Sequence, residues 1–558
     1  MAFVINSDSL IPIDKPFKVS AGPGAGKTHW LSLHIKNVIE RSKLLGVSRK
    51  VACISYTNVG ADSILERISN DSSFVDVCTI HSFLYNNVIK PFLHFEADRW
   101  GINPYLIKVV PTESFLTKGF SMLTLKYIRN TWLSPDSFLE GLRNCKWVYE
   151  GSAFTKFKPK YPIKAKNIKG KVTKYPVPQN AYDAYVQYRW SQNLISYDDV
   201  IYLAIELIRL HPEIYNILIA KYPYFFIDEF QDSTPPIVDL IKELGNRGVI
   251  VGVVGDKAQT IYDFIGASVE LFDNFTVPNM VQYEILGNRR STQEIITLLN
   301  CIRKDFPQEP IDNKRGEKPY LLVGDKLNAY KISTEICNSK DVQSLAFPNI
   351  VANSMKYCVS KERNTSNLID SDFDINYERG GYIRCFLKAT EYAFHGDLRE
   401  AWYQLDFVND DRNITMGYLR KLLNNRDKFI NGTLFDFFLF VRNNVHYNIP
   451  VLRQGVTKEF YLNHSYLDMA VSMKVSDSNT LHKTVHKAKG EEYDNVLLVI
   501  DDSSDIEVLI NPNLNEATHR VYYVGMSRAK HNLFINVDSL SDNNKTLLSK
   551  LPITIINV

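Results

Sequence analysis

The sequence has few cysteines, little net charge and no long apolar run. Its seven cysteines include no CxxC pair, which argues against a disulfide framework or zinc site and favours a reduced, cytoplasmic protein. The net charge of +3 excludes a uniformly basic protein, so a surface for an acidic partner must be local. No stretch approaches the ~18 apolar residues of a membrane span. The first residues lack a basic segment followed by an apolar one, so we expect neither a signal peptide nor a membrane partner.

The composition supplies enough apolar residues for a hydrophobic core. Hydrophobic residues make up 45% of the chain and charged residues 23%, the balance of a globular protein. At about 150 residues per domain, the length predicts roughly three to four domains. We find no internal repeat of fixed period.

A glycine-rich turn between a short strand and a helix is the strongest local signal. The turn consists of Ala21, Gly22, Pro23, Gly24, Ala25, Gly26, Lys27 and Thr28. Backbone N–H groups of such a turn and the helix after it can cradle a polyphosphate. Lys27 would then reach the terminal phosphates and Thr28 would hold Mg²⁺. The strict pattern has glycine where Ala21 stands, so an ordinary turn remains the alternative for this segment taken alone.

Strands alternate with helices on both sides of this pattern. Apolar strands are expected at residues 51–56, 75–80, 222–227 and 248–254, which predicts a parallel sheet flanked by helices. Ligands bind such sheets at the carboxyl ends of the strands. Asp228 and Glu229 directly follow one of these strands. Adjacent carboxylates there are costly unless they hold a metal ion or a proton.

The middle of the chain is basic and the later part is helical. Helices are expected at residues 113–132 and 137–148, and residues 151–174 hold eight lysines and no acid. This stretch is either a solvated loop or ribbon, or a contact for a phosphate backbone. A second α/β region is expected from residue 318, with a helix at 516–530 and a closing strand at 533–537. Residues 361–375 are interpreted as a linker to a small helical insertion.

The ordered motifs resemble those of superfamily 1 helicases of the UvrD/Rep/PcrA group. In chain order they are AGPGAGKT from residue 21, ISYTNVGADSILER from 54, TIHSF from 79, SYDDV from 196, IDEFQDST from 227, VVGDKAQTIYDFIGA from 253, NRRST from 288, TVHKAKGEEYDNV from 484 and RVYYVGMSRAK from 520. Each block alone carries a risk of a false match, but so many blocks in family order leave little room for chance.

The resemblance implies an α/β fold with two RecA-like P-loop NTPase cores, each carrying an inserted, mainly helical subdomain. The first core is expected at residues 1–89 and 195–290, with a basic insertion at 90–194. The second core is expected at residues 291–369 and 478–558, with a reduced insertion at 370–477.

The resemblance also assigns the NTP-hydrolysing residues. Besides Lys27, Asp228 would hold Mg²⁺, Glu229 would deprotonate the attacking water and Gln259 would sense the γ-phosphate. Arg290 and Arg528 match the two arginine fingers, although a surface salt bridge remains the alternative for Arg528. Glu492, in the block from residue 484, is a further nucleotide-binding candidate.

Other positions match the family's contacts with a nucleic-acid strand. They are Tyr56, Thr57, Asn58, His81, Phe264, Thr484 and His486. Tyr56 and Phe264 could stack on bases, and the alternative is that both are ordinary core aromatics. Lys164, Lys166, Lys169 and Lys171 are the backbone-contact candidates of the basic stretch.

Three departures concern the nucleotide base. No glutamine precedes Lys27, so the family's adenine-reading residue is missing; His29 stands where an arginine usually lies; and Arg289 replaces an adenine-stacking tyrosine. A base could still stack on the Arg289 guanidinium. We therefore expect ATP and Mg²⁺ as cofactors with relaxed base selectivity. Ile265 also replaces an arginine of the block from residue 253.

The implied function is an ATP-dependent DNA helicase or translocase, moving 3′ to 5′ on single-stranded or tailed duplex DNA in repair or antiphage defence. The alternative is a nucleotide-gated DNA-binding subunit that controls a partner nuclease and unwinds little itself. In size and layout the chain resembles the helicase subunit of the Gabija antiphage system, which works beside an OLD-type nuclease. An RNA motor is a weaker alternative, since no reader of the 2′-OH is identified.

Overall fold

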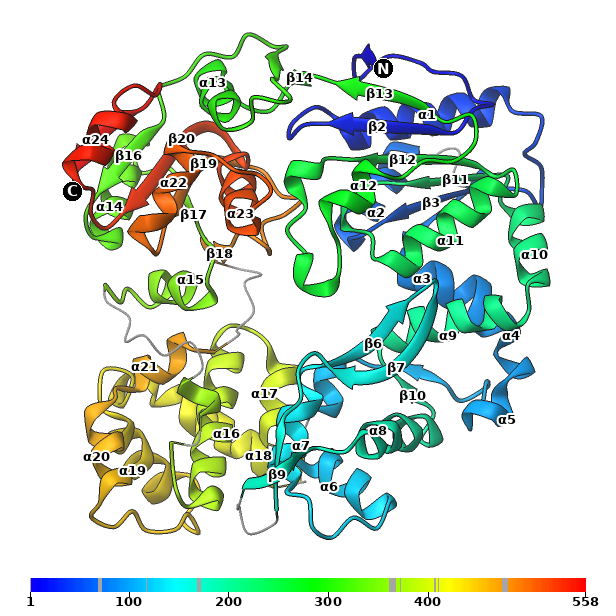
Figure 1. Cartoon of the computed structure of the whole chain (residues 1–558). Coiled ribbons are helices and arrows are strands. Elements are labelled where there is room, and N and C mark those ends of the chain that lie inside the picture. Colours follow the sequence, from blue (N-terminus) through cyan, green and yellow to red (C-terminus); the bar gives the residue numbers. More distant parts are fainter. Residues whose placement is uncertain are drawn as a thin grey trace. The chain divides into compact units, whose positions relative to one another are not determined.

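The structure is a computed structural model, and its elements are labelled in Figure 1. It describes the chain except for Met1 and residues 69–72, 117, 168–171, 361–367, 372, 406–407, 410 and 474–479. The chain forms two compact units, Met1–Leu286 and Gly287–Val558. The boundary therefore follows Leu286, whereas the sequence placed the end of the first core at residue 290. The finer division into four domains stays a prediction.

The first unit is built on a seven-stranded parallel sheet. Its strands, in spatial order, are β1 (Phe3–Ile5), β13 (Val281–Ile285), β2 (Phe17–Ala21), β12 (Ile250–Gly255), β11 (Tyr224–Ile227), β3 (Val51–Ser55) and β4 (Val75–Thr79). Strands β3 and β11 are buried at every position. Such continuous apolar runs are typical of parallel strands covered on both faces.

Successive residues of these strands feed two separate cores, one on each face of the sheet. Cys53 and Phe226 pack with Trp30 of α1 (Lys27–Arg41) and with α2 (Asn58–Ile68). Ile54 and Phe225 pack into the larger core, with α3 (Ile80–Leu84), α9 (Tyr197–Leu210) and α11 (Pro235–Asn246). This period-two alternation fixes the register of each strand.

The segment between β4 and α9 mixes helices with hairpins. Its helices are a π-helix at Tyr85–Ile89, α4 (Lys90–Phe92), α5 (Ala97–Trp100), α6 (Lys118–Tyr127), α7 (Pro135–Leu142) and α8 (Gln179–Ser191). Its strands are β5 (Lys108–Val109), which pairs with β10 (Leu194–Ile195), and the hairpins β6 (Cys145–Glu150) with β7 (Ala153–Pro159) and β8 (Lys164–Lys166) with β9 (Val172–Pro176). α10 (Glu213–Lys221) and α12 (Val269–Asp273) complete the first unit.

Two helix predictions in this segment were wrong in their extent. The helix expected at residues 137–148 ends at Leu142, and Cys145 opens β6. Tertiary contacts override the local pattern here, because Trp147 reaches Asp199 of α9 and Tyr149 reaches Asp239 of α11. The helix expected at residues 113–132 is replaced by a 3₁₀-helix at Thr112–Phe115 and by α6, which ends at Tyr127. Arg129 just beyond α6 has a φ of 53°.

The second unit carries a six-stranded parallel sheet. In spatial order its strands are β18 (His482–Thr484), β17 (Gln343–Ala346), β19 (Tyr493–Val499), β20 (Ala529–Val537), β16 (Tyr320–Val323) and β21 (Thr554–Asn557). The accompanying helices are α13 (Gln293–Ile302), α14 (Lys326–Ile336), α15 (Asn349–Lys356), α22 (Glu507–Ile510), α23 (Ala517–Met526) and α24 (Asp542–Leu548). The helix predicted at 516–530 was too long, because the chain turns after Met526 and enters β20 at Ala529. The short strands β14 (Gly287–Asn288) and β15 (Glu309–Pro310) pair with each other.

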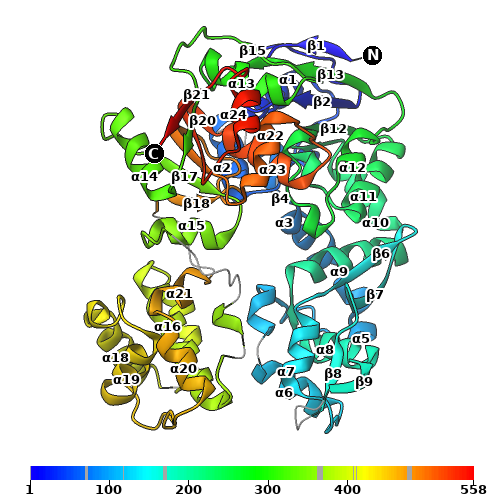
Figure 2. The ribbon, with the colours of Figure 1, turned by 60° about the vertical axis from the view of Figure 1, so that its left-hand side comes forward.

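In the described part of the chain between α15 and β18, six α-helices surround a core of their own. They are α16 (Tyr377–Phe394), α17 (Leu398–Leu405), α18 (Arg412–Asn424), α19 (Leu434–Asn444), α20 (Val456–Asn463) and α21 (Tyr466–Val471), and Figure 2 shows them grouped together. The linker predicted at residues 361–375 was wrong for its second half: Leu368 and Ile369 enter this core, and buried Asp374 pairs with Arg379 at 2.6 Å. Residues 361–367 and 372 lie outside the described part.

The architecture confirms the predicted fold class. Two parallel sheets flanked by helices are present, with inserted segments between their strands, as expected for two RecA-like cores. The first insertion is less helical than predicted, since it contains two hairpins. Within the described residues, every helix is too short or too polar to cross a membrane.

Candidate functional site

The glycine-rich turn connects β2 to α1 and leaves the helix start open to an anion. Gly24 and Gly26 have φ angles of 70° and 80°, a left-handed conformation that glycine adopts without strain. No side chain caps α1, and no acidic residue lies in its first turn. The first N–H groups of α1 are therefore available to a phosphate, which the helix dipole also favours. A Cβ atom at Gly26 would lie 3.2 Å from Cβ of Ser7, so the turn is closely packed.

Lys27 and Thr28 lie against the carboxylates that follow β11. Thr28 Oγ1 donates to Asp228 Oδ2 at 3.0 Å, and Lys27 Nζ lies 4.0 Å from Glu229 Oε1. Burial and the neighbouring Glu229 raise the pKa of Asp228 to about 7, against the opposing effects of Lys27 and Thr28. A hydroxyl and a carboxylate this close match the oxygen ligands that Mg²⁺ takes from proteins, with phosphate oxygens and water completing the shell. These residues therefore fit a magnesium–nucleotide complex.

Glu229 is held by a chain of hydrogen bonds that ends at Gln259. Gln231 donates from Nε2 to Glu229 and accepts at Oε1 from the backbone N–H of Asp256 at 3.0 Å. Asp256 accepts from Gln259 Nε2 at 2.7 Å. The carboxylate after β11 and the amide after β12 are thus linked through neighbouring strand ends. Gln231 and Asp256 were missed as positioning residues, although both lie inside the quoted motif blocks.

Beside the glycine-rich turn, an acidic and two basic side chains occupy the region that we associate with the base. His29 Nε2 lies 3.1 Å from Asp8 Oδ1, and Arg67 Nη1 lies 3.4 Å from His29 Nδ1. Trp30 Nε1 donates to the carbonyl oxygen of Ser9 at 3.0 Å, which ties the N-terminal segment to α1. Asp8 and Arg67 were not among the predicted residues, because only folding brings them to His29.

In the second unit, Arg290 is bound to the segment that precedes β19. Its Nη2 donates to Glu492 Oε1 at 2.8 Å, and its Nη1 donates to the Ser527 carbonyl oxygen at 2.9 Å. Lys530 Nζ lies 3.7 Å from Glu492 Oε2. Burial alone would raise the pKa of Glu492, but Arg290, Lys530 and Arg528 outweigh it and lower that pKa. The carboxylate is therefore held ionised among cations.

Arg528 and Arg289 differ in their surroundings. Arg528 is buried, and it donates to the Val524 carbonyl oxygen at 3.1 Å and to Ser527 Oγ at 2.9 Å. It is therefore not the exposed surface residue of the alternative interpretation. Arg289 is half-exposed, with Nη1 3.7 Å from Asp312 Oδ1.

The predicted nucleic-acid positions in the first unit lie at strand ends and in loops. Tyr56 donates from its hydroxyl to Ser233 Oγ at 2.7 Å, and its ring is half-buried against the larger core. Thr57 and Asn58 are exposed at the start of α2. His81 packs edge-on against Tyr197, and burial lowers its pKa. Phe264 is 69% exposed, so it is not a core aromatic.

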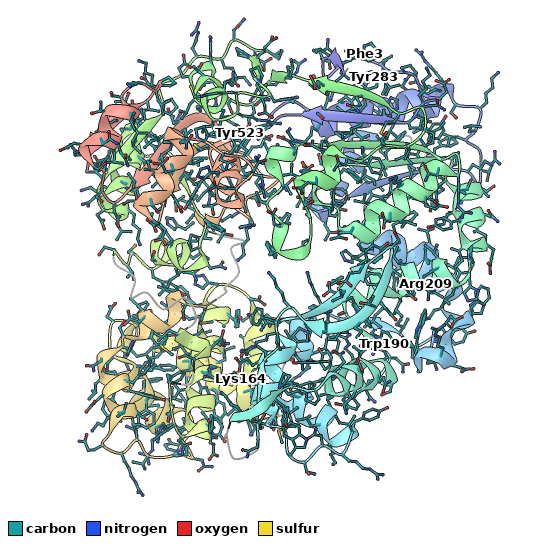
Figure 3. The ribbon with its side chains drawn as sticks, in the orientation of Figure 1. Phe3, Lys164, Trp190, Arg209, Tyr283 and Tyr523 are labelled. Atoms are coloured by element: carbon teal, nitrogen blue, oxygen red, sulfur yellow. The ribbon has the colours of Figure 1, made fainter. Side chains whose placement is uncertain are left out.

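The remaining nucleic-acid candidates are in the second unit and in the basic hairpins. Thr484 is buried at the end of β18, and the His486 ring lies 5.7 Å from that of Phe347. Lys164, labelled in Figure 3, and Lys166 belong to β8 of the first unit. Lys169 and Lys171 lie outside the described residues.

Two family models match the chain. Residues 6–278 match the UvrD/REP helicase N-terminal domain, and residues 462–539 match the UvrD-like helicase C-terminal domain. Together these segments cover more than half of the chain and contain the glycine-rich turn, Asp228, Glu229 and Arg528. The chain belongs to the UvrD-like superfamily 1 helicases.

Curated members of the UvrD-like family are similar to this chain over its larger part. A probable DNA helicase II homolog of Mycoplasma capricolum is 25% identical over 346 residues, which are 60% of this chain and 44% of that protein. The ATP-dependent DNA helicase PcrA of Staphylococcus aureus is 25% identical over 342 residues, 59% of this chain and 43% of that protein. PcrA of Bacillus subtilis is 25% identical over 336 residues, 59% and 42%. The match spans less than half the length of these relatives.

Proposed function

We propose that this UvrD-like chain is a DNA-stimulated NTP hydrolase that works as a DNA helicase or translocase. The observation that carries the proposal is the cluster of Lys27, Thr28, Asp228 and Glu229, where a hydroxyl and a carboxylate 3.0 Å apart face the open start of α1. Bound Mg²⁺ would supply charge neutralisation at the β- and γ-phosphates. PcrA relatives are named ATP-dependent DNA helicases, which supports the same activity here.

Each residue of the cluster has a role that its position supports. Lys27 and the N–H groups of the turn hold the phosphates, and Thr28 and Asp228 hold the metal. Glu229 orients and deprotonates the attacking water, and the Gln231–Asp256–Gln259 chain fixes that carboxylate relative to the γ-phosphate position. In phosphoryl transfer such positioning and charge stabilisation supply most of the rate.

Substitution of Glu229 tests the assignment. Glu229→Gln should reduce NTP turnover by about 10² to 10⁴-fold, the usual contribution of a positioned general base, while nucleotide and DNA binding persist. Turnover is measured as phosphate release with and without single-stranded DNA, and binding with a fluorescent nucleotide. Glu213→Gln, at an exposed position of α10, is the control. Wild-type turnover by Glu229→Gln would show that another group is the base.

We propose that the site has low selectivity for the base of the nucleotide. No glutamine precedes Lys27, and His29 is engaged by Asp8 and Arg67. A site that hydrogen-bonds one base specifically rejects analogues by about 10⁴-fold or more. We expect kcat/KM for GTP and CTP to fall within about tenfold of the value for ATP. Hydrolysis assays with the three nucleotides check this, and a strict preference for ATP would contradict it.

The direction of movement is proposed to be 3′ to 5′ on single-stranded DNA, on the strength of the family resemblance. Streptavidin displacement from oligonucleotides biotinylated at either end measures it directly. Release from the 5′ end alone is the expected result. Release from the 3′ end alone would reverse the direction.

The second candidate function is a nucleotide-gated subunit that controls a partner nuclease. The small helical insertion favours this candidate, since α16 to α21 occupy only Tyr377–Val471. The family resemblance implies that this insertion regulates unwinding, so a small one is consistent with a chain that unwinds little. Strand displacement on a tailed duplex by the isolated chain decides between the two, because robust unwinding excludes this candidate. An OLD-type partner nuclease and roles in antiphage defence or DNA repair stay predictions.

A further inference from the structure

Two consecutive glutamates end the turn between β18 and β19 of the second unit, and they bind separate partners. Glu491 accepts from Lys483 Nζ of β18 at 2.8 Å and from the hydroxyl of Tyr493, the first residue of β19. Glu492 accepts from Nη2 of Arg290, 202 positions earlier in the chain, at 2.8 Å. The first carboxylate thus joins the two strands, and the second holds an arginine from a distant segment.

The first half of this turn is fixed by packing against the sheet. Val485 donates its backbone N–H to the carbonyl oxygen of Ala346 in β17 at 2.9 Å. The side chains of Val485 and Ala488 are fully buried. In the sheet, β17 lies between β18 and β19. The core therefore determines where the turn begins.

The second half of the turn relies on Glu491. Gly490 is exposed and has a φ of 87°, a conformation that costs glycine little and leaves its backbone free to adopt others. Glu491 is the next residue, and its carboxylate ties the backbone to both strands. Glu492 is exposed, and an exposed ion pair orients its partners only weakly. The place of Glu492 therefore follows from the contacts of Glu491.

The guanidinium of Arg290 depends in turn on Glu492. Its two side-chain hydrogen bonds go to the Glu492 carboxylate and to the Ser527 carbonyl oxygen. A guanidinium has five N–H donors, so donors remain for the oxygens of a phosphate. Of the two acceptors, the carboxylate is the charged one, and charge-assisted hydrogen bonds are the stronger. A displacement of Glu492 would therefore move the guanidinium.

We infer that Glu491 is a positioning residue for Arg290. Through Lys483 and Tyr493 it fixes the backbone at Glu492, and Glu492 then holds the arginine in a constant place. In this role Glu491 acts through its neighbour and needs no contact with the nucleotide. The inference rests on the proposed function, and on the arginine-finger role that the family resemblance implies for Arg290.

The competing interpretation is a surface ion pair that contributes to stability alone. The second unit offers a matched control for it, the pair of Lys388 and Asp370. Its N–O distance is 2.7 Å, with 19% and 40% of the two side chains exposed. The corresponding values for Lys483 and Glu491 are 2.8 Å, 14% and 39%. Removal of either pair should therefore cost a similar, small amount of stability.

The test uses substitutions in the full chain. Glu491→Gln removes the carboxylate charge at nearly constant size, Lys483→Met removes the cation, and Lys483→Glu with Glu491→Lys exchanges the two charges. Glu491→Gln is also made in the Arg290→Ala background. Asp370→Asn removes the control pair. Single-turnover NTP hydrolysis with saturating single-stranded DNA measures turnover, and thermal midpoints measure stability.

Glu491→Gln should lower turnover by about 10 to 100-fold, because a displacement of about 1 Å in a positioned group costs up to about 10²-fold. Lys483→Met should lower turnover by a similar factor, and the charge exchange should recover most of the loss because it restores the ion pair. In the Arg290→Ala background Glu491→Gln should have little further effect, since residues that act as a unit are not additive. Asp370→Asn should change turnover by less than about twofold, with a thermal midpoint close to that of Glu491→Gln.

Three outcomes overturn the inference. They are wild-type turnover by Glu491→Gln, an equally large loss in the Arg290→Ala background, and a loss from Asp370→Asn as large as that from Glu491→Gln. For a charge-exchange variant that does not fold, Lys483→Met decides, and wild-type turnover by that variant also overturns the inference.

The same assays separate this inference from the proposed function. Absence of NTP hydrolysis by the wild-type chain would overturn the proposed function itself. Wild-type turnover by Arg290→Ala would overturn the arginine-finger role, and the role of Glu491 with it. Hydrolysis that Arg290→Ala reduces and Glu491→Gln leaves unchanged would overturn only the role of Glu491.

Discussion

At the scale of single residues, hydrogen bonds hold Glu229 in an unfavourable backbone conformation. Its φ of 55° places it in the left-handed region, which costs a residue with a Cβ atom about 1–2 kcal/mol. The hydrogen bond from Gln231 and the one from its own backbone N–H to Asp228 Oδ1, at 3.0 Å, offset this cost. Strain of this kind persists where the surroundings fix the residue, in keeping with the proposed role of Glu229.

His34 is a buried residue whose pKa makes the stability of the protein depend on pH. It stacks on Trp30 with centroids 5.4 Å apart, and it lies edge-on to Phe17 at 4.8 Å. Burial lowers the pKa of His34 from 6.5 to about 3. The unfolded chain therefore binds a proton here below pH ~6.5 that the folded chain excludes. The stability contribution is complete above the unfolded pKa and is lost as the pH falls toward the folded pKa.

We predict that acid destabilises the wild-type protein more than His34→Leu. Between about pH 7.5 and about pH 5, the pH-dependent loss in free energy of unfolding should be about 2 kcal/mol larger for the wild type, at ~1.4 kcal/mol per unit below pH ~6.5. Urea unfolding at both pH values measures it. His531→Leu, at an exposed position of β20, is the control. Parallel pH dependence of wild type and His34→Leu would contradict the prediction.

At the scale of elements, α9 joins the basic insertion to the core. Its N-cap Ser196 and Asp199 form a capping box. The same Asp199 carboxylate pairs with Arg189 of α8 at 2.7 Å and accepts from Trp147 of β6. Asp199 and Arg189 are both almost fully buried. One carboxylate thus caps the start of α9, neutralises the buried cation of Arg189 and anchors the β6–β7 hairpin.

We predict that Asp199→Asn destabilises the first unit by about 3 kcal/mol or more, because breaking a buried ion pair leaves an uncompensated charge. Chemical denaturation followed by tryptophan fluorescence measures the change, since Trp147 and Trp190 lie at this joint (Figure 3 labels Trp190). Asp62→Asn, at an exposed position of α2, should change the free energy by less than about 0.5 kcal/mol. A similarly small effect of Asp199→Asn would show that the ion pair is not needed.

At the scale of the whole molecule, the proposed catalytic groups are divided between the two units. Lys27, Asp228 and Glu229 belong to Met1–Leu286, whereas Arg290 and Arg528 belong to Gly287–Val558. The role of the two arginines as fingers therefore stays a proposal, which substitution of Arg290 tests.

Arg290→Ala should reduce NTP turnover by about 10³ to 10⁵-fold, as for arginine fingers elsewhere. Nucleotide affinity should change by less than about tenfold, because the phosphate cradle lies in the other unit. Single-turnover hydrolysis and fluorescent nucleotide binding measure the two effects. Arg315→Ala, at a residue whose side chain is 72% exposed, is the control. A loss of nucleotide affinity equal to the loss of turnover would show that Arg290 contributes to nucleotide binding and not specifically to the transition state.

Much of this protein could be read from its sequence, because some signals are local. The glycines before Lys27, the apolar strands and the carboxylates after β11 depend on backbone geometry and burial along short segments. Their order along the chain indicated the fold class and the UvrD-like family. Phosphate chemistry needs these residue types at fixed spacing. The pattern can therefore be recognised in the sequence without the tertiary contacts.

The tertiary structure decided the features that join distant segments. The meeting of Asp8, His29 and Arg67, the path from Glu229 to Gln259, and the contact of Arg290 with Glu492 have no signature in any one segment. The same reason explains why residues 145–148 are strand and not helix: Trp147 gains a partner in α9 that no local pattern shows. Local propensities are worth tenths of a kcal/mol per residue, and a buried contact between distant segments outweighs them.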